Sequence, residues 1–325
     1  MTIPPKLSPG DTIRVVAPAK SLSVISKEQL DLATQRLTEE GFTVTFSKNC
    51  QEQDMFDSSS IESRVADLHE AFADPGVKAI LTVLGGFNSN QVLQYLDYDL
   101  IKSNPKILCG YSDITALANA ITSKTGLVTY SGLHYSTWGM EKEFSYNKHY
   151  FAKCLYSEEP FDVLPAETWS DDEWYIDQQS RVLEKNSGLW TIQEGSCEGH
   201  IIGGNLCTLN LLQGTPYMPS LVGAVLFIED DHVVDAVTFE RDLQSLLHLP
   251  DASQLRGVVI GRFQRASNVT RKQITHIIQT KELLQDIPVL ANADFGHTNP
   301  LFTFPIGGTV RITASNTPRI TIMKH

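Results

Sequence analysis

The stretch KILCGYSDITALAN, Lys106 to Asn119, passes from an apolar run through a sharp corner into a helical pattern. Ser112 stands at the corner, and Ile114, Leu117 and Ile121 recur after it at helical spacing. A strand that leads directly into a helix is the building unit of parallel α/β sheets. Such a corner lies at the carboxyl edge of the strands, where open α/β sheets bind their ligands. This stretch therefore predicts an α/β fold with a functional residue at that edge.

The residues before this stretch repeat the alternation of strand and helix signals. Ser26 is a suitable N-cap for the first helical pattern, and Gly41 follows its end. Because short strands alternate with helices, we expect a parallel sheet covered by helices on both faces. The apolar runs span 12–19, 42–47 and 77–86, and the helical patterns span 26–41, 59–76 and 89–97.

A different composition separates this pattern from a second α/β pattern that begins near residue 195. The four tryptophans all lie between residues 138 and 190, and residues 158–184 contain nine acids but only one base. Long connections in compact proteins are usually functional or disordered, and the aromatic content argues against disorder. The tail at 307–324 predicts a β-hairpin or two edge strands. We predict an N-terminal α/β domain over 1–160, a Trp-rich acidic connection over 161–194, named the flap segment below, and a C-terminal α/β domain over 195–325.

The composition argues against several classes of protein. The 325 residues include 26 Lys and Arg against 38 Asp and Glu, which gives a net charge of −12. An acidic chain repels phosphate backbones, so we expect no nucleic-acid partner. The apolar runs are too short for a membrane span, and no signal-peptide pattern is visible, so we expect a cytoplasmic protein without a membrane partner. The five scattered cysteines are expected to be reduced structural thiols.

Two interpretations of Ser112 follow from the pattern alone. A serine lifted out of the sheet at such a corner is exposed, and the N–H groups and dipole of the next helix face any oxyanion formed there. This is the physics of a nucleophile elbow. The sequence reads G-Y-S-D, however, and not the G-x-S-x-G of the α/β-hydrolases. Ser112 and Asp113 can equally cap the helix, with Asp113 as its N-cap.

The glycine loop, residues 84–90 (LGGFNSN), follows an apolar run and precedes a helical pattern. Gly85 and Gly86 can offer main-chain N–H groups to an anion. They could supply half of an oxyanion hole, bind a phosphate as in a transferase, or simply turn the chain. The G-x-G-x-x-G fingerprint is absent, so the sequence gives poor support for a dinucleotide site.

A serine nucleophile needs a base, and that base needs a carboxylate to fix its tautomer. Glu229 continues the apolar run GAVLFIED, and His297 lies in a loop after the run PVLAN. His297 is therefore a candidate base, with His134 and His200 as rivals. A solvated acidic loop and a structural histidine are the alternative interpretations. No histidine shows metal-ligand spacing such as H-E-x-x-H, so we expect no metal.

Taken together, these motifs resemble the serine LD-carboxypeptidase family, which includes muramoyltetrapeptide carboxypeptidase and the microcin C immunity peptidases. The resemblance implies that Ser112 is the nucleophile, Glu229 the orienting carboxylate and His297 the base, with oxyanion-hole N–H groups from Gly86 and Asp113. It also implies a flavodoxin-like N-terminal sheet, a mixed α/β C-terminal domain, a site at the domain cleft that needs no metal or cofactor, and a homodimer. It covers nearly the whole chain, through LSPGDTIRVVAPA, GGFNSNQVLQYLDYDLI, GYSDITAL, EGHIIGGNL, LFIEDD and DFGHTNP in this order.

Within that family, the glycine loop and the Trp-rich segment resemble the microcin C immunity branch, whose members stack aromatic side chains on a nucleobase. This implies hydrolysis of an amide bond in peptidyl- or aminoacyl-nucleotide compounds, with Trp174, Trp190 and Asn88 as candidate substrate-binding residues. The alternative substrate is a murein tetrapeptide, from which the enzyme would release the terminal D-Ala. The tryptophans could equally pack the domain interface. A rival of another class is a non-catalytic ligand-binding α/β protein in which Ser112 caps its helix.

Overall fold

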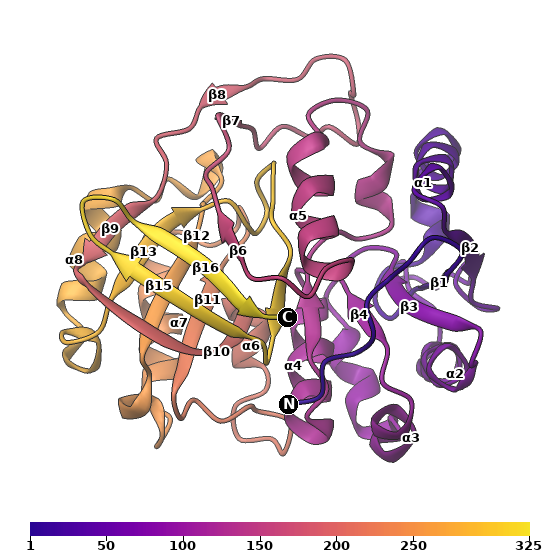
Figure 1. Cartoon of the computed structure of the whole chain (residues 1–325), viewed down its shortest axis with the longest axis horizontal. Helices are drawn as coiled ribbons and strands as arrows, with labels where there is room; N and C mark the ends of the chain where they lie inside the picture. Colours follow the sequence, from indigo (N-terminus) through magenta and orange to yellow (C-terminus); the bar gives the residue numbers. More distant parts are fainter.

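The computed structural model describes residues 1–325, and two sheets organise the chain (Figure 1). The first sheet has six strands in the order β14-β5-β4-β3-β1-β2. Strands β1 to β5 run parallel, and β14 is antiparallel to β5. The order of β1 to β5 is that of a flavodoxin-like sheet, as expected. The strands are β1 Thr12–Val16, β2 Thr43–Phe46, β3 Val77–Thr82, β4 Ile107–Cys109, β5 Thr129–Ser131 and β14 Phe304–Ile306.

Helices cover both faces of this sheet, which confirms the expectation from the strand pattern. Leu81 of β3 packs in the same apolar cluster as Leu37 of α1, whereas the adjacent Ile80 packs in a second cluster with Phe72 of α2. Successive residues of a strand point to opposite faces, so the two clusters are the two covered faces. The helices are α1 Lys27–Glu39, α2 Ile61–Ala73, α3 Tyr98–Ser103, α4 Ile114–Thr125 and α5 Ser145–Leu155.

The second sheet has eight strands in the order β6-β16-β15-β10-β11-β12-β13-β9. Its central strands β10 to β13 are parallel and its outer pairs are antiparallel, so the sheet is mixed, as expected. Strands β15 and β16 form the predicted hairpin. The elements are β6 Phe161–Val163, β9 Trp190–Gln193, β10 Gly195–Asn205, α6 Leu206–Asn210, β11 Ala224–Glu229, α7 Ala236–Leu247, β12 Gly257–Gly261, α8 Arg271–Gln279, β13 Val289–Ala293, β15 Thr309–Ala314 and β16 Arg319–Lys324.

One strand from the C-terminal part of the chain joins the first sheet, and the two sheets share a packed seam. Strand β14 comes from the C-terminal part of the chain but pairs with β5, so it returns the chain to the first sheet. Phe304 of β14 packs against Phe227 of β11, with ring centroids 5.0 Å apart, and against Phe295 at 5.2 Å. The chain ends also lie side by side (Figure 1), and Lys6 Nζ donates a hydrogen bond to the carbonyl oxygen of His325 at 2.6 Å. These contacts fix one sheet relative to the other.

The flap segment 161–194 is largely irregular, although β6 and β9 at its ends belong to the second sheet. Between them, β7 Thr168–Trp169 and β8 Glu184–Lys185 form a two-stranded sheet in the loop that arches over the top of the molecule in Figure 1. Hydrogen bonds to a buried ion pair outside this loop anchor it. Arg262 and Asp294 form a buried pair at 2.6 Å, and Asn186 of the flap segment donates to and accepts from that pair.

Two local predictions were wrong. Residues 89–97 do not form one α-helix, because Ser89–Tyr95 is a 3-10 turn and a new helix, α3, starts after Asp97, whose side chain caps it. Asp113 stands at the N-cap position of α4, but its side chain makes no cap hydrogen bond. Its backbone is already helical, at φ −54° and ψ −25°, unlike the extended backbone of a capping residue. No helix of the structure has the length and apolar character that a membrane span requires.

Candidate active site

Three of the predicted residues meet where the two sheets approach each other. His297 Nε2 lies 3.0 Å from Ser112 Oγ, and His297 Nδ1 lies 2.7 Å from Glu229 Oε2. Because the carboxylate can only accept, it fixes the proton of the ring on Nδ1 and leaves Nε2 as the acceptor for the serine hydroxyl. The result is a continuous hydrogen-bonded chain from a carboxylate through an imidazole to a hydroxyl.

The backbone places Ser112 at the corner between β4 and α4. Its φ is +61°, in the left-handed region that residues other than glycine seldom adopt. Such outliers persist where the surroundings over-determine them, and they cluster at functional sites. A Cβ added to Gly85 would lie 2.8 Å from Ser112 Cβ and 2.9 Å from Ser112 Oγ. The glycine loop therefore packs directly on the serine, and only a glycine fits there.

Glu229 and His297 come from the second sheet. Glu229 is the last residue of β11 and is 2% exposed, and His297 lies in the loop after β13 with 19% of its side chain exposed. Gly296 precedes the histidine with φ +104°, and a Cβ there would lie 2.4 Å from Glu229 Oε2. A side chain at residue 296 would thus collide with the carboxylate. The glycine allows the histidine loop to pass close to the end of β11.

The electrostatics of this side are dominated by carboxylates. Burial acts to lower the pKa of His297, but the charge and hydrogen bond of Glu229, aided by Asp231 and Asp230, outweigh it and raise that pKa above its ordinary value. Burial, together with the charges of Glu229 and Asp231, raises the pKa of Asp230 to about 7. Asp230 Oδ1 accepts a hydrogen bond from Asn205 at 3.1 Å, whereas its buried Oδ2 has no partner in the protein.

Several main-chain N–H groups near Ser112 have no acceptor within the protein, among them those of Gly85, Gly86, Phe87, Ser112 and Asp113. The amides of Asp113 and Gly86 donate to no main-chain or side-chain oxygen, although Asp113 is 2% exposed. Buried amides are nearly always paired, so a free amide at the start of a helix beside a serine suggests a binding role. The Asp113 amide directly follows Ser112 in sequence. The Gly86 amide follows Gly85, which packs against Ser112.

The rival histidines do not reach Ser112. His134 is fully buried, and its Nδ1 lies 2.7 Å from Thr82 Oγ1. Burial lowers the pKa of His134 to about 3, so the ring is neutral. The ring of His134 packs against that of Tyr111 in a tilted arrangement, with centroids 4.3 Å apart, and Tyr111 in turn contacts His297 edge-on at 5.7 Å. His200 lies in β10, five residues before the strand end that neighbours Glu229. His134 therefore supports the site as a packed neutral ring.

The predicted substrate-binding residues occupy different settings. Trp174 is 9% exposed and packs edge-on against Tyr175, and Trp190 is half-buried beside Arg271 and donates a hydrogen bond to Ser187. Asn88 is half-buried, and its main chain, not its side chain, makes the hydrogen bonds at the loop. The structure does not bring these three side chains into hydrogen-bonded or stacked contact with Ser112 or His297.

Sequence reasoning missed a polar connection between the nucleophile helix and the second sheet. Asn119 of α4 donates to the carbonyl oxygen of Gly203 at 2.8 Å and accepts from the Gly203 N–H at 3.3 Å. One turn earlier, Thr115 Oγ1 accepts from the Asn205 N–H at 2.9 Å. Because Asn205 is the register partner of Glu229, these bonds help to set the distance between the two sides of the site. The available signal was the presence of polar residues on a buried face of α4.

This arrangement is suited to acyl transfer. A hydroxyl next to an imidazole that is oriented by a carboxylate can be activated as a nucleophile, and free N–H groups beside it can stabilise an oxyanion. No group of three or more His, Cys, Asp or Glu side chains in the structure could hold a metal ion.

Comparisons with known families match both halves of the chain. The LD-carboxypeptidase N-terminal domain matches residues 13–132, and the LD-carboxypeptidase C-terminal domain matches residues 198–312. YocD of Bacillus subtilis, which is named as a carboxypeptidase, is 57% identical over 98% of this chain and 99% of its own length. The microcin C7 self-immunity protein MccF of Escherichia coli is 32% identical, over 95% of this chain and 92% of its own length.

Other relatives include both murein peptide carboxypeptidases and MccF-like proteins. A Bacillus subtilis protein named as a murein peptide carboxypeptidase is 32% identical over 94% of this chain and 89% of its own. An MccF-like protein from Bacillus anthracis, solved by crystallography, is 56% identical with a TM-score of 0.99, and covers 100% of both chains. MccF in complex with aspartyl sulfamoyl adenosine is 30% identical with a TM-score of 0.90, over 100% of this chain and 99% of the other.

Proposed function

The chain belongs to the LD-carboxypeptidase family, and from that premise we propose that Ser112, His297 and Glu229 are the catalytic triad of this carboxypeptidase. The observation that supports the proposal is the hydrogen-bonded chain Glu229–His297–Ser112, with distances of 2.7 and 3.0 Å. Each residue has the chemistry and the orientation that its role requires, and the three come from two different sheets.

The proposed reaction has two steps. His297 Nε2 accepts the proton of Ser112 Oγ as the oxygen attacks the carbonyl carbon of the scissile amide, and then delivers that proton to the leaving nitrogen. This leaves an acyl group on Ser112. A water molecule that is deprotonated by His297 hydrolyses the ester and restores the serine. Glu229 keeps the Nδ1 proton in place and stabilises the imidazolium that forms in each step.

The N–H groups of Gly86 and Asp113 are the proposed oxyanion donors. Their support is that neither amide has another acceptor and that both adjoin residues in contact with Ser112. Loss of one such donor costs about 10²–10³-fold in kcat in comparable sites. The dipole of α4 points the same way, because the helix begins at Ile114, directly after these residues.

We propose the division 1–160, 161–194 and 195–325 as the functional parts of the chain. The first part supplies Ser112 and the oxyanion donors, and the last supplies Glu229 and His297. The loop of the flap segment that contains β7 and β8 passes over the top of the molecule (Figure 1). The homodimer that the resemblance implies stays a prediction, and light scattering of the purified protein would check it.

For the substrate, we propose an aminoacyl- or peptidyl-nucleotide, cleaved at the amide that joins the acyl group to the nucleotide-like part. Support comes from the glycine loop and from the MccF relatives, one of which was solved with aspartyl sulfamoyl adenosine. A nucleobase needs an aromatic face, and Phe87 and Tyr175 are 82% and 55% exposed, whereas Trp174 is 9% exposed.

The second candidate is a murein tetrapeptide with a terminal D-Ala. It is supported by the relative that is named as a murein peptide carboxypeptidase, at the same 32% identity as MccF. The same triad serves both reactions, because each cleaves an amide bond, and the difference lies in what binds on the two sides of that bond.

A cleavage assay separates these candidates. Wild type, Ser112→Ala and His297→Ala are each incubated with aspartyl sulfamoyl adenosine and, separately, with a murein tetrapeptide, and the products are identified by mass spectrometry. Release of the nucleoside part by wild type alone supports the nucleotide substrate and the triad. Release of D-Ala alone supports the triad and identifies the murein tetrapeptide as the substrate. Equal cleavage by wild type and Ser112→Ala rules out the proposed nucleophile.

A further inference from the structure

The middle of the glycine loop, residues 85–87, has no side chain that anchors it. Gly85 and Gly86 have none, and the ring of Phe87 points to solvent with 82% of its surface exposed. Apolar burial therefore contributes little to the position of the Gly86 N–H, which is one of the two proposed oxyanion donors. An oxyanion donor must be fixed to within a fraction of an ångström to be effective, so another contact has to hold this loop.

That contact comes from the side chain of Asp113. Asp113 Oδ2 accepts hydrogen bonds from the N–H of Ser89 at 2.8 Å and from the N–H of Asn88 at 3.1 Å. In return, Ser89 Oγ donates to the carbonyl oxygen of Asp113 at 2.6 Å. Asp113 is 2% exposed, so these bonds form away from solvent. Hydrogen bonds to a charged acceptor are stronger than those between neutral groups.

This use of the carboxylate explains why Asp113 does not cap its own helix. The residues at the N-cap positions of α1, α2, α3, α6, α7 and α8 all accept a hydrogen bond from an N–H of the helix that follows, whereas Asp113 does not. A helix that forgoes its cap loses some stability. The carboxylate instead bridges 24 residues of sequence to the loop that packs on Ser112.

Other contacts hold the loop from the opposite side. The buried guanidinium of Arg64 donates to the carbonyl oxygens of Asn88 and Pro18, at 2.9 and 3.2 Å. The N–H of Lys20 donates to the carbonyl oxygen of Gly85 at 3.2 Å. These bonds engage carbonyl groups, whereas Asp113 is the acceptor for the loop's N–H groups. Among these contacts, only those of Asp113 connect the loop to a residue that adjoins the nucleophile in sequence.

We propose that the Asp113 carboxylate is a positioning group that fixes the Gly86 N–H relative to Ser112, so that a single residue aligns both oxyanion donors. Its own N–H is one donor, and its side chain sets the other by holding the chain two residues beyond Gly86. The proposal rests on the proposed function, because it assigns the carboxylate a purpose in the same acyl transfer. It also predicts that loss of the carboxylate affects the transition state more than it affects substrate binding.

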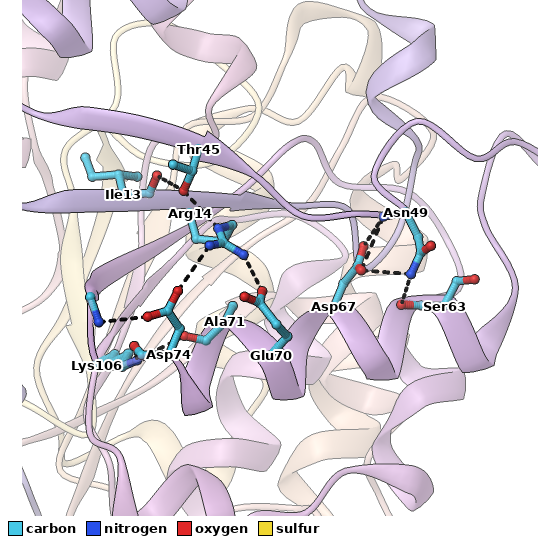
Figure 2. Close-up of polar contacts among 11 residues, drawn as sticks. Ile13, Arg14, Thr45, Asn49, Ser63, Asp67, Glu70, Ala71, Asp74 and Lys106 are labelled. Carbon is cyan, nitrogen blue, oxygen red and sulfur yellow. Dashed lines mark hydrogen bonds and ion pairs between the residues drawn. The ribbon is translucent and has the colours of Figure 1, made fainter.

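A matched control lies on the same side of the molecule. Asp67 of α2 is 5% exposed, and its carboxylate accepts from the N–H of Asn49 at 3.1 and 3.3 Å, and from Asn49 Nδ2 at 2.9 Å (Figure 2). Asp67 thus performs the same physical task as Asp113, since a buried carboxylate holds the N–H of a distant loop. That loop, after β2, contains none of the proposed catalytic residues. Substitutions at Asp67 report the cost of such a contact for stability alone.

The experiment compares Asp113→Asn and Asp113→Ala with Asp67→Asn and Asp67→Ala. Hydrogen exchange, read by mass spectrometry on peptides covering residues 84–93, reports the loop without any substrate. Steady-state kcat and KM are measured on aspartyl sulfamoyl adenosine and on a murein tetrapeptide. We expect Asp113→Ala to speed exchange at residues 88 and 89 and to lower kcat by about 10²-fold, as for loss of one oxyanion donor, with KM changed less than threefold. Asp113→Asn keeps an acceptor oxygen and should retain more of kcat than Asp113→Ala does.

Three results would overturn the proposal. The first is that hydrogen exchange of the loop is unchanged in Asp113→Ala. The second is that Asp113→Ala keeps a kcat near that of wild type although its loop exchanges faster. The third is that Asp67→Ala loses as much kcat as Asp113→Ala, which would assign the effect to stability. If wild type cleaves neither compound, the proposed function fails, but the exchange measurement still supports or overturns the hold of Asp113 on the loop. The two failures are therefore distinguishable.

Discussion

The two sides of the site are built by different physical means. On the side of the first sheet, backbone geometry sets the position of Ser112, through its φ of +61° and the close packing of Gly85. On the side of the second sheet, charge dominates, because Glu229, Asp230 and Asp231 all influence the pKa of His297. The difference indicates that changes on the first side should act on geometry without altering the pH dependence, whereas changes on the second should shift it.

The largest effect is expected for Glu229→Gln. The amide cannot favour the imidazolium as the carboxylate does, so kcat should fall by roughly 10³–10⁴-fold. The pH profile should change as well. His297 must be neutral to act as a base, and Glu229 raises its pKa, so the acidic limb of kcat/KM should move to lower pH in the variant.

The measurement is kcat/KM as a function of pH for wild type, Glu229→Gln and the control Glu198→Gln. Glu198 forms an exposed pair with Arg311 and should leave the profile unchanged. An unshifted acidic limb in Glu229→Gln would show that the carboxylate does not set the pKa of His297.

Gly85→Ala tests the other side. The added methyl group would lie 2.8 Å from Ser112 Cβ, so the serine or the glycine loop must move. A displacement of this kind costs about 10²-fold in rate. We expect kcat to fall by that factor while the acidic limb of the kcat/KM pH profile stays unchanged. The control is Gly76→Ala, in the exposed turn before β3. A shift of that limb in Gly85→Ala would contradict the idea that changes beside Ser112 act on geometry alone.

Asp230→Asn should alter stability more than turnover. The pKa of Asp230 is about 7 in the folded protein and about 4 when unfolded, so the folded state keeps a proton that the unfolded state loses between these values. Stability from this group is therefore lost as the pH rises from 4 to 7. The side-chain amide of the Asp230→Asn variant does not titrate, so it avoids this loss of stability. Its oxygen can still accept the hydrogen bond from Asn205.

Urea unfolding at pH 5 and pH 8 measures this effect. At pH 8 the free energy of unfolding of Asp230→Asn should exceed that of wild type by about 1–4 kcal/mol, and at pH 5 the difference should be smaller. An equal difference at both values would mean that Asp230 does not titrate as described.

The smallest effect is expected in the flap segment. Arg265, which lies outside the flap segment, pairs with Asp171 and Glu184 inside it. The Arg265 and Glu184 side chains are 46% and 44% exposed, and exposed pairs contribute about 0–1 kcal/mol. Asp171 is 7% exposed, but its carboxylate also accepts from the main-chain N–H of residue 265, which the substitution keeps. Arg265→Gln should lower the melting temperature by only a few degrees and leave kcat unchanged. A large loss of kcat would show that the flap segment takes part in the chemistry.

Local pattern predicted much of the fold and the candidate site because both depend on order along the chain. The alternation of apolar runs and helical patterns predicted the parallel strands, and the strand ends before Ser112 and His297 identified residues that prove to be neighbours. Contacts between distant segments had no such signal. The return of β14 to the first sheet, the break in residues 89–97 and the hydrogen bond from the Ser89 N–H to Asp113 all depend on packing partners far away in sequence. Periodicity within one segment contains no information about such partners.

The central claim is that Ser112 becomes acylated, and rapid-quench mass spectrometry tests it most directly. Wild type is mixed with the compound that it cleaves and is quenched with acid within milliseconds, and the intact protein and its peptides are weighed. The account predicts a mass increase equal to the acyl group, located on the peptide that contains Ser112, and none in Ser112→Ala. An adduct on another peptide, or one that persists in Ser112→Ala, would contradict the account.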